Sequence, residues 1–245
     1  MNPQSFGLYT DMYELTMGQA YFKEGMAGTP ACFDHFFRTN PFEGGYVVFA
    51  GLGDALEILA ELCFSREDLD YLKSLQFDAR FIAYLKHFRF RGDVYSVREG
   101  EIVFPLEPIV RLEGTLLETQ LVETALLNIL NFQSLIATKA SRIRLAAGTR
   151  VLSDFGLRRA HGWGGVQASR AAVIGGFDST SNVYSAFRYD LRPAGTMAHS
   201  YVESHDDEIT AFRKYAEAHP HNSIFLVDNY DTLRSGVPNA VTVAK

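Results

Sequence analysis

The sequence predicts an α/β protein in which an α+β N-terminal module is followed by an incomplete (β/α) barrel. Up to residue 146, segments with helical and strand-like patterns are mixed, whereas after Gly148 strand-like runs, polar turns and helical runs alternate. Alternation of that kind is typical of a parallel sheet or barrel. With 47% hydrophobic residues, the chain can also bury a large core. We therefore predict one module at residues 1–146 and a barrel segment at residues 147–245.

Short patterns define the elements of the first module. Apolar residues recur at three- and four-residue spacings in four segments, which favours helices, and three short β-rich runs separated by turn residues favour an antiparallel meander. The helices are expected at residues 10–22 (with Asp11 as a cap), 51–62, 66–75 and 79–88, a strand at 31–37, and the meander at 93–97, 101–104 and 109–113. A long helix at 118–146 with two adjacent apolar stripes is expected to form a buried spine between the modules.

The barrel segment is predicted from four strand, turn and helix units. Their strands are expected at residues 151–155, 176–178, 195–197 and 223–227, and their helices at 168–174, 181–187, 208–218 and from 231 onwards. A complete barrel of this kind needs eight units. We therefore expect these residues alone to be inactive and prone to associate, because a half-closed parallel sheet exposes an unpaired edge and one apolar wall.

Composition argues against several classes of function. The formal net charge is −6 and the 23 Lys and Arg residues are scattered, so no nucleic-acid partner is expected. Cys32 and Cys63 stand in no zinc-ligand or disulfide spacing, which fits a reducing cytoplasm. The N-terminus lacks a secretory signal pattern, and the longest apolar stretch, residues 121–136, holds too many polar residues to span a bilayer. A cytoplasmic protein that acts on small molecules, away from membranes, is the expectation.

Each predicted barrel strand ends in a polar cluster, which is where parallel barrels carry their active sites. The clusters read FGLRR from Phe155, GGFDSTSN from Gly175, GTMAHS from Gly195 and LVDNYD from Leu226. Together with TDMYELTM and FFRTNPFEGGYVVFAGL upstream, in this order and spacing, they resemble the nicotinate phosphoribosyltransferases over nearly the whole chain. Relatives that use nicotinamide differ in the opening and histidine motifs, so nicotinate is favoured.

The resemblance implies an activity and its ligands. Such a type II phosphoribosyltransferase forms nicotinate mononucleotide and pyrophosphate from nicotinate and phosphoribosyl pyrophosphate in NAD salvage, with Mg²⁺ and with ATP hydrolysed through a phosphohistidine. The sequence has neither a P-loop nor a dinucleotide-binding glycine motif, so barrel loops are expected to hold the phosphates. The alternatives are transfer to nicotinamide or quinolinate, and a non-catalytic half-barrel subunit that needs a partner chain.

His199 in GTMAHS is the residue on which the resemblance places the phosphoryl group. A neutral imidazole is a competent phosphoryl acceptor at cellular pH, and it needs a carboxylate to orient its other ring nitrogen. The resemblance assigns that part to Asp228. Glu203 is a local alternative, but residues 200–202 are a poor start for the helix that would bring it onto the same face.

Tyr13 and Phe155 resemble the two faces of an aromatic slot for the pyridine ring, with ordinary core packing as the alternative for both. In the family Tyr13 reaches the site across a dimer interface, so a homodimer is implied, with the option of a second chain that completes the barrel. Arg158 resembles a substrate-contacting arginine, with a surface salt bridge as its alternative. Because adjacent strand residues face opposite ways, only one of Arg158 and Arg159 is expected to point into the pocket.

The remaining candidates are hydroxyls and charges suited to phosphate or carboxylate oxygens. They are Ser179, Thr180, Thr196, Asp178 and Arg38. Asp178 beside an anionic substrate would need a Mg²⁺ ion, a ribose hydroxyl or protonation. Arg38 is expected either to reach phosphate from the second subunit or to be a surface charge at a strand end.

Overall fold

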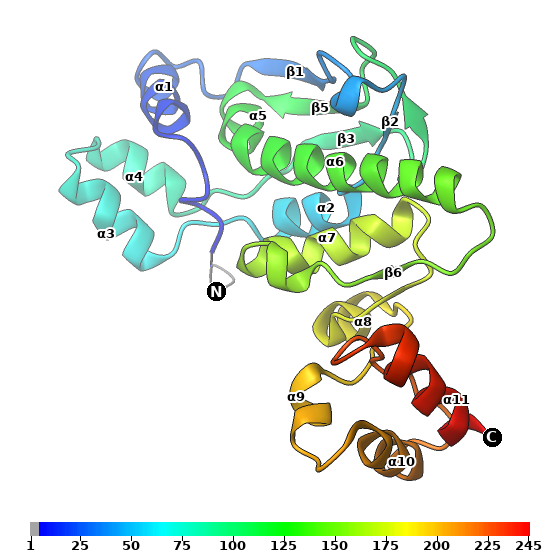
Figure 1. Cartoon of the computed structure of the whole chain (residues 1–245). Coiled ribbons are helices and arrows are strands. Elements are labelled where there is room, and N and C mark those ends of the chain that lie inside the picture. The colour runs from blue at the N-terminus through cyan, green and yellow to red at the C-terminus, as the bar shows by residue number, and fades with distance from the viewer. Residues whose placement is uncertain (1–4) are drawn as a thin grey trace. The chain divides into compact units, whose positions relative to one another are not determined.

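Helices and short strands follow one another along the chain in the computed structural model, which describes residues 5–245, and this confirms the predicted α/β class (Figure 1). The described residues divide into two units, the first ending at Arg192 and the second comprising Pro193–Lys245. No helix among these residues is long and apolar enough to cross a lipid bilayer.

Four helices of the first unit lie where the apolar spacing predicts them. They are α1 (Met12–Lys23), α2 (Leu52–Glu61), α3 (Arg66–Ser74) and α4 (Ala79–Leu85). Ser65 and Asp68 form a capping box that starts α3, and Asp78 caps α4. Asp11 occupies the cap position of α1, but its side chain makes no capping bond and accepts instead from Thr124 Oγ1 at 3.1 Å. The predicted capping bond of Asp11 is therefore wrong.

The strands of the first unit form two separate antiparallel sheets, not one meander. Strands β1 (Pro30–His35), β5 (Val110–Thr115) and β3 (Asp93–Ser96) form a sheet in the order β1-β5-β3, and β2 (Val47–Val48) pairs with β4 (Ile102–Val103). The predicted meander is wrong at β4, because its segment bonds to residues 47–49 instead of its sequence neighbours: Phe49 N donates to Glu101 O at 3.0 Å.

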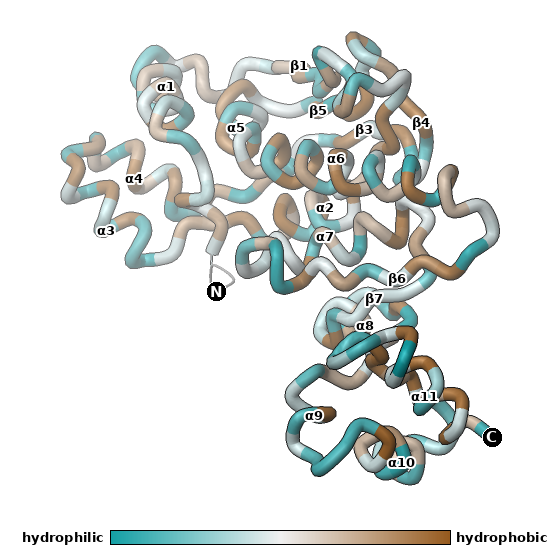
Figure 2. The backbone as a smooth tube through the Cα atoms, viewed as in Figure 1, coloured by the Kyte–Doolittle hydropathy of each residue, from teal (hydrophilic) through white to brown (hydrophobic). Residues whose placement is uncertain are grey.

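The predicted spine helix is two helices, α5 (Leu116–Leu121) and α6 (Glu123–Ala147), which meet at Val122. A capping box between Thr115 and Glu118 starts α5 two residues earlier than predicted. Leu121, Ala125 and Ile129, which form one of the two expected apolar stripes, are all buried. Figure 2 shows apolar and polar residues alternating along α6, as expected of a helix with distinct faces.

A polar stripe on α6 completes the backbone hydrogen bonding around β2. Val48 N donates to Thr138 Oγ1 at 2.9 Å, and Ala50 N donates to Ser134 Oγ at 3.0 Å. The two hydroxyls are four residues apart, so they lie on one helix face. Since an unpaired buried N–H is costly, these hydroxyls fix the position of the short strand on the helix.

The end of the first unit also packs against α6. It contains β6 (Ser153–Asp154), the 3₁₀ turn η2 (Leu157–Arg159), α7 (Gly162–Ile174), β7 (Ser179–Thr180) and α8 (Val183–Tyr189). A side chain at Gly175 would place its Cβ 2.3 Å from Ala137 O, so glycine permits the close approach of α6 and α7. Because of this packing the first unit extends past the predicted boundary at residue 146. A barrel segment beginning at residue 147 stays a prediction.

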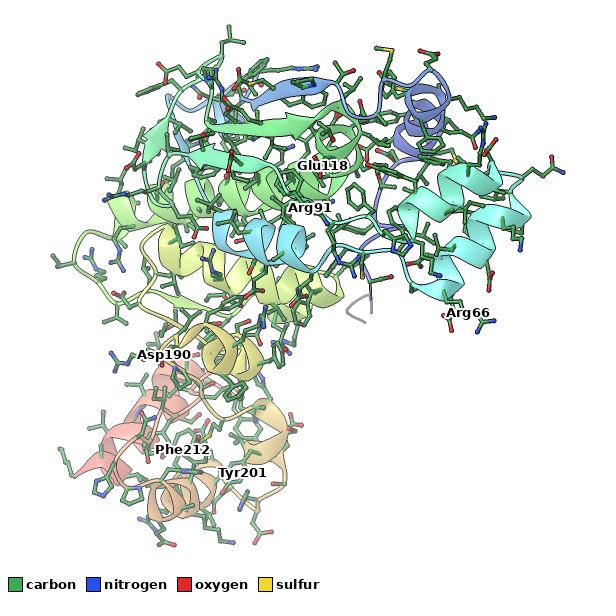
Figure 3. All side chains as sticks on the ribbon, turned by 180° about the vertical axis from the view of Figure 1, so that it is seen from behind. Arg66, Arg91, Glu118, Asp190, Tyr201 and Phe212 are labelled. Carbon is green, nitrogen blue, oxygen red and sulfur yellow. The ribbon has the colours of Figure 1, made fainter. Side chains whose placement is uncertain are left out.

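Strands β6 and β7 pair in parallel, as expected of a β/α arrangement, but they are short and β7 lies just after the predicted residues 176–178. In the second unit α9 (His199–Glu203), α10 (Glu208–Ala218), the π-helical turn η3 (Thr232–Gly236) and α11 (Val237–Ala244) surround an apolar cluster that includes Phe212 (Figure 3). Helix α10 has the predicted bounds. The predicted strands at 195–197 and 223–227 are not strands here, because neither segment forms a backbone ladder within residues 5–245.

A largely buried ion pair joins the loop before β4 to α7. Arg170 donates to both carboxylate oxygens of Glu99, at 2.7 and 2.6 Å, and its guanidinium lies 5.5 Å from the centroid of the Tyr189 ring. Burial raises the pKa of Glu99, but the hydrogen bonds and charge of Arg170 outweigh it and the pKa is lowered. The stability that this pair contributes is therefore present above the ordinary pKa of Glu and is lost as the pH falls through the lowered value.

We expect Arg170→Met to lower the free energy of unfolding at neutral pH by about 3 kcal/mol, because it leaves a buried carboxylate without its partner. Arg66→Met is the matched control: the Arg66 side chain is 96% exposed in its pair with Asp70 and points outward (Figure 3), so a loss below about 0.5 kcal/mol is expected. Denaturant unfolding measures both. Equal losses of unfolding free energy in the two variants would show that the buried ion pair contributes no more stability than the exposed one.

Candidate functional site

The ends of β6 and β7 are joined by side-chain hydrogen bonds. Ser153 Oγ and Ser179 Oγ lie 2.6 Å apart, and Thr180 Oγ1 donates to Asp154 Oδ2 at 2.9 Å. The other carboxylate oxygen of Asp154 accepts from Gly156 N at 2.9 Å and closes the turn that follows β6. Ser179 and Thr180 are only 2% and 0% exposed. Their hydroxyls, predicted to contact substrate, are thus engaged inside the protein and hold the two strand ends together.

The turn after β6 presents one aromatic ring and two cations to the surface. Phe155 is 48% exposed, so it is not a core residue. Arg158 and Arg159 lie in η2 and both are exposed, so the alternation expected of a strand does not apply to them. Neither guanidinium takes part in an ion pair within residues 5–245. Both charges therefore remain available to an anion.

Asp178, just before β7, already has a cationic partner. Arg144 Nη2 lies 2.5 Å from its carboxylate, and Leu152 N donates to the same oxygen at 2.7 Å. The Leu152 hydrogen bond first, and then Arg144, lower the pKa of Asp178. Asp178 is therefore ionised at neutral pH, which is at odds with the protonated form considered from the sequence. Arg144, which sequence reasoning missed, supplies its neutralising charge.

In the second unit, His199 and Asp228 come together. His199 Nε2 lies 3.4 Å from Asp228 Oδ1, and both side chains are more than half exposed. Helix α9 begins at His199, so the expectation that no helix starts there is wrong. Glu203 ends that helix, yet the carboxylate next to the imidazole is that of Asp228. Thr196 is exposed and its hydroxyl donates to Met197 O at 2.8 Å.

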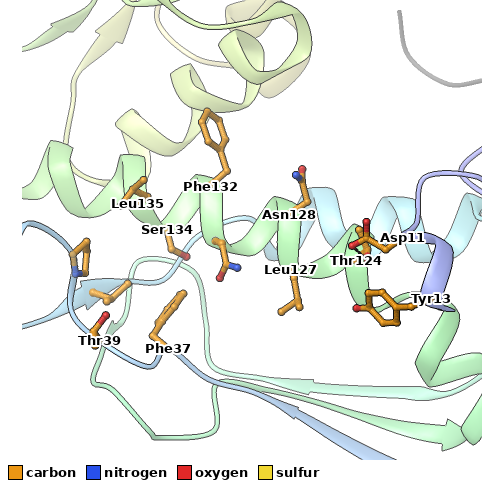
Figure 4. A pocket seen from close by; sticks show the side chains of 13 residues that line it. Asp11, Tyr13, Phe37, Thr39, Thr124, Leu127, Asn128, Phe132, Ser134 and Leu135 are labelled. Atoms are coloured by element: carbon orange, nitrogen blue, oxygen red, sulfur yellow. Dashed lines mark hydrogen bonds between the residues drawn. The ribbon is translucent and has the colours of Figure 1, made fainter.

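Tyr13 lies at one end of a groove of about 650 Å³ that runs along α6 (Figure 4). The Tyr13 hydroxyl donates to Glu123 Oε1 at 3.2 Å and the side chain is 44% exposed. Phe37 and Leu127 form apolar walls further along, and Arg38 lines an adjoining groove of about 600 Å³. Among residues 5–245 no ring contact joins Tyr13 to Phe155. The two rings of the predicted slot are thus not paired within this chain.

We expect Thr180→Val to lower the free energy of unfolding by about 1–3 kcal/mol, because it removes the hydroxyl that donates to Asp154 Oδ2 and accepts from Asn182 N. Thr196→Val removes an exposed hydroxyl and should change stability by less than about 0.5 kcal/mol. Thermal unfolding of the two variants side by side is the measurement. A stable Thr180→Val protein would show that this hydroxyl does not support the strand ends.

Comparison with known proteins gives consistent matches. The family model of the nicotinate phosphoribosyltransferase N-terminal domain matches residues 8–131. The nicotinate phosphoribosyltransferase of Bacillus subtilis is 51% identical, covering 98% of this chain and 49% of that protein, and one from Mycobacterium tuberculosis is 45% identical, covering 97% and 51%. The crystal structure of human nicotinic acid phosphoribosyltransferase superposes with a TM-score of 0.88 at 34% identity, over 97% of this chain and 58% of that one.

A more distant likeness is to the nicotinate-nucleotide pyrophosphorylase of Pyrococcus furiosus, with a TM-score of 0.77 at 26% identity over 97% of this chain and 54% of that one. This chain spans about half the length of the curated relatives it matches.

Proposed function

The chain belongs to the nicotinate phosphoribosyltransferase family, and from this membership we propose that the complete enzyme forms nicotinate mononucleotide and pyrophosphate from nicotinate and phosphoribosyl pyrophosphate in NAD salvage. In this reaction the pyridine nitrogen bonds to the anomeric carbon of the ribose as the bond to pyrophosphate breaks. The observation that carries the proposal is the family match over residues 8–131, supported by 51% identity along nearly the whole chain.

The turn after β6 supports the proposed binding of an anionic pyridine. Phe155 offers a half-exposed ring to an electron-poor pyridine, where stacking adds about 0.5–1.5 kcal/mol beyond burial. Three residues on, Arg158 offers a guanidinium that can bind a carboxylate or phosphate through two parallel hydrogen bonds. We propose that Thr196 contacts phosphate or carboxylate oxygens and that Arg38 contacts phosphate. Ser179, Thr180 and Asp178, which also support the strand ends, are proposed to contact the substrate as well.

His199 is the proposed phosphoryl acceptor. The imidazole attacks the γ-phosphorus of ATP, a nitrogen–phosphorus bond forms, and ADP leaves. Asp228, at 3.4 Å from Nε2, would orient the ring and stabilise its positive charge, which leaves Nδ1 as the attacking atom. Hydrolysis of the phosphohistidine would then drive the transfer forward.

Mg²⁺ is the metal we propose, and it would neutralise phosphate oxygens during the transfer. Within residues 5–245 no group of three or more His, Cys, Asp and Glu side chains is arranged to hold a metal ion. Mg²⁺ commonly keeps several waters and binds through substrate phosphates and one or two carboxylates. We therefore propose that the ion binds as a complex with phosphoribosyl pyrophosphate or ATP and is held mainly by their phosphates.

We further propose a cytoplasmic homodimer in which Tyr13 of one subunit faces Phe155 of the other. The separate locations of the two rings support a shared site, since each is half exposed and the chain does not pair them. A second polypeptide that completes the barrel is the alternative assembly.

The acceptor is tested by assaying the complete enzyme with nicotinate, nicotinamide and quinolinate at equal concentrations. We expect kcat/KM to be highest for nicotinate, because nicotinamide has no carboxylate for Arg158 to bind and quinolinate has a second acid group to which the proposed slot assigns no partner. A preference for either other acceptor would refute the proposed substrate. Absence of all three activities would favour the non-catalytic subunit.

We expect the complete enzyme to become labelled at His199 when it is given ATP with a radioactive γ-phosphate. The label should be stable in alkali and labile in acid, as a phosphoramidate is. Asp228→Asn should slow labelling by about tenfold or more, because the ring loses its anionic partner. Label that persists in His199→Ala would refute the assignment.

We expect Tyr13→Ala and Phe155→Ala to raise the KM for nicotinate by about tenfold, roughly the value of one aromatic stack, with little change in the KM for ATP. Only the pyridine ring is stacked in the proposed slot. Circular dichroism of each variant controls for misfolding. Equal losses of affinity for both ligands would contradict the slot.

A further inference from the structure

The carboxylate of Glu14, on the first turn of α1, is fully buried and is not used by the proposed reaction. It is 0% exposed, and its Oε1 accepts from Thr124 N at 2.9 Å and from Thr124 Oγ1 at 2.6 Å. Its Oε2 accepts from the hydroxyl of Thr10. A buried carboxylate is costly without partners, so three donors at one side chain indicate a specific location.

Two of the three donors belong to Thr124 at the start of α6, where a carboxylate is favoured. Thr124 is the second residue of α6, and its backbone N–H is one of those that the helix itself cannot satisfy. The helix dipole adds to the attraction of a negative charge at that end. Burial raises the pKa of Glu14, and the hydrogen bonds from Thr10 and Thr124 oppose that rise. Glu14 therefore holds the first turn of α1 against the first turn of α6.

Neighbouring residues make weaker or more exposed contacts with the same turn of α6. Tyr13 OH donates to Glu123 Oε1 at 3.2 Å, and Asp11 Oδ2 accepts from Thr124 Oγ1 at 3.1 Å. Figure 4 shows Tyr13, Asp11 and Thr124 together at one end of the groove. A single long hydrogen bond on an exposed hydroxyl holds the Tyr13 ring poorly. The backbone beside that ring, by contrast, is held in place by the hydrogen bonds of the buried Glu14 carboxylate.

We propose that Glu14 is a positioning residue for Tyr13: its buried carboxylate fixes α1 on α6 and so sets where the Tyr13 ring lies. The proposal rests on the proposed function, in which that ring stacks on the pyridine. A displaced ring weakens stacking on the acceptor but leaves the phosphate contacts in place. The effect of Glu14 should therefore appear in the KM for nicotinate and act only through Tyr13.

The test is a double-mutant cycle in the complete enzyme with nicotinate as the varied substrate. We expect Glu14→Ala to raise the KM for nicotinate by about tenfold, with kcat and the KM for phosphoribosyl pyrophosphate within about threefold. In the Tyr13→Ala background the same change should have no further effect on that KM. Glu14→Gln, which keeps an acceptor for Thr124, should restore most of the affinity. Glu24→Ala, an exposed change beyond the other end of α1, is the control.

Two results separate this proposal from its premise. A Tyr13→Ala enzyme with an unchanged KM for nicotinate would overturn the aromatic slot and this proposal with it. A Glu14→Ala effect that adds in full to that of Tyr13→Ala, or that reduces kcat and affinity for every substrate alike, would overturn this proposal alone. If Glu14→Ala does not fold, Thr124→Val takes its place, because it removes the hydroxyl donor, with Thr124→Ser as its control.

Discussion

Polar side chains along α6 satisfy groups on the elements around it, and the rest of the first unit is arranged by these contacts. At the start of the helix Thr124 binds the buried carboxylate from α1, in the middle Ser134 and Thr138 complete β2, and near the end Arg144 binds Asp178. The buried carboxylate of Glu14 and the buried N–H groups of Val48 and Ala50 would be costly without these partners, whereas the contact of Arg144 with Asp178 is an ion pair at the surface. The groove beside Tyr13 and the strand ends of β6 and β7 are thus both built on one helix.

The proposed chemistry separates into two kinds of group. The turn after β6 carries stacking and positive charge, which suit recognition of a pyridine carboxylate and of phosphates. The second unit carries the His199 and Asp228 pair, which suits acceptance of a phosphoryl group from ATP. The hydroxyls of Ser179 and Thr180 also make hydrogen bonds within the protein, to Ser153 and Asp154. The motif around β7 therefore supports the strand ends in addition to its proposed contacts with substrate.

Local patterns predicted most of the helices, though not α9 or the break between α5 and α6, whereas the strands and several partners depend on distant residues. Helix α10 has its predicted bounds because amphipathic spacing is a property of the segment itself. Strand β4 pairs with residues more than fifty positions earlier, and Arg144 reaches Asp178 across 34 residues, so neither followed from nearby sequence. The motifs identified the family, and they placed Asp228 beside His199 although the helix that starts at His199 was not expected.

The most direct test of the shared, nicotinate-specific site is a subunit-mixing experiment. Complete enzyme carrying Tyr13→Ala and complete enzyme carrying Phe155→Ala are purified separately, mixed under conditions that exchange subunits, and assayed for nicotinate mononucleotide at a nicotinate concentration well below the wild-type KM. If each site takes one ring from each subunit, every mixed dimer has one site with both rings and one site with neither. Random exchange makes half of the dimers mixed, so a quarter of all sites are intact and the mixture should recover roughly a quarter of the wild-type activity. Activity that stays at the level of the separate variants after exchange, or formation of a different nucleotide, would contradict the account.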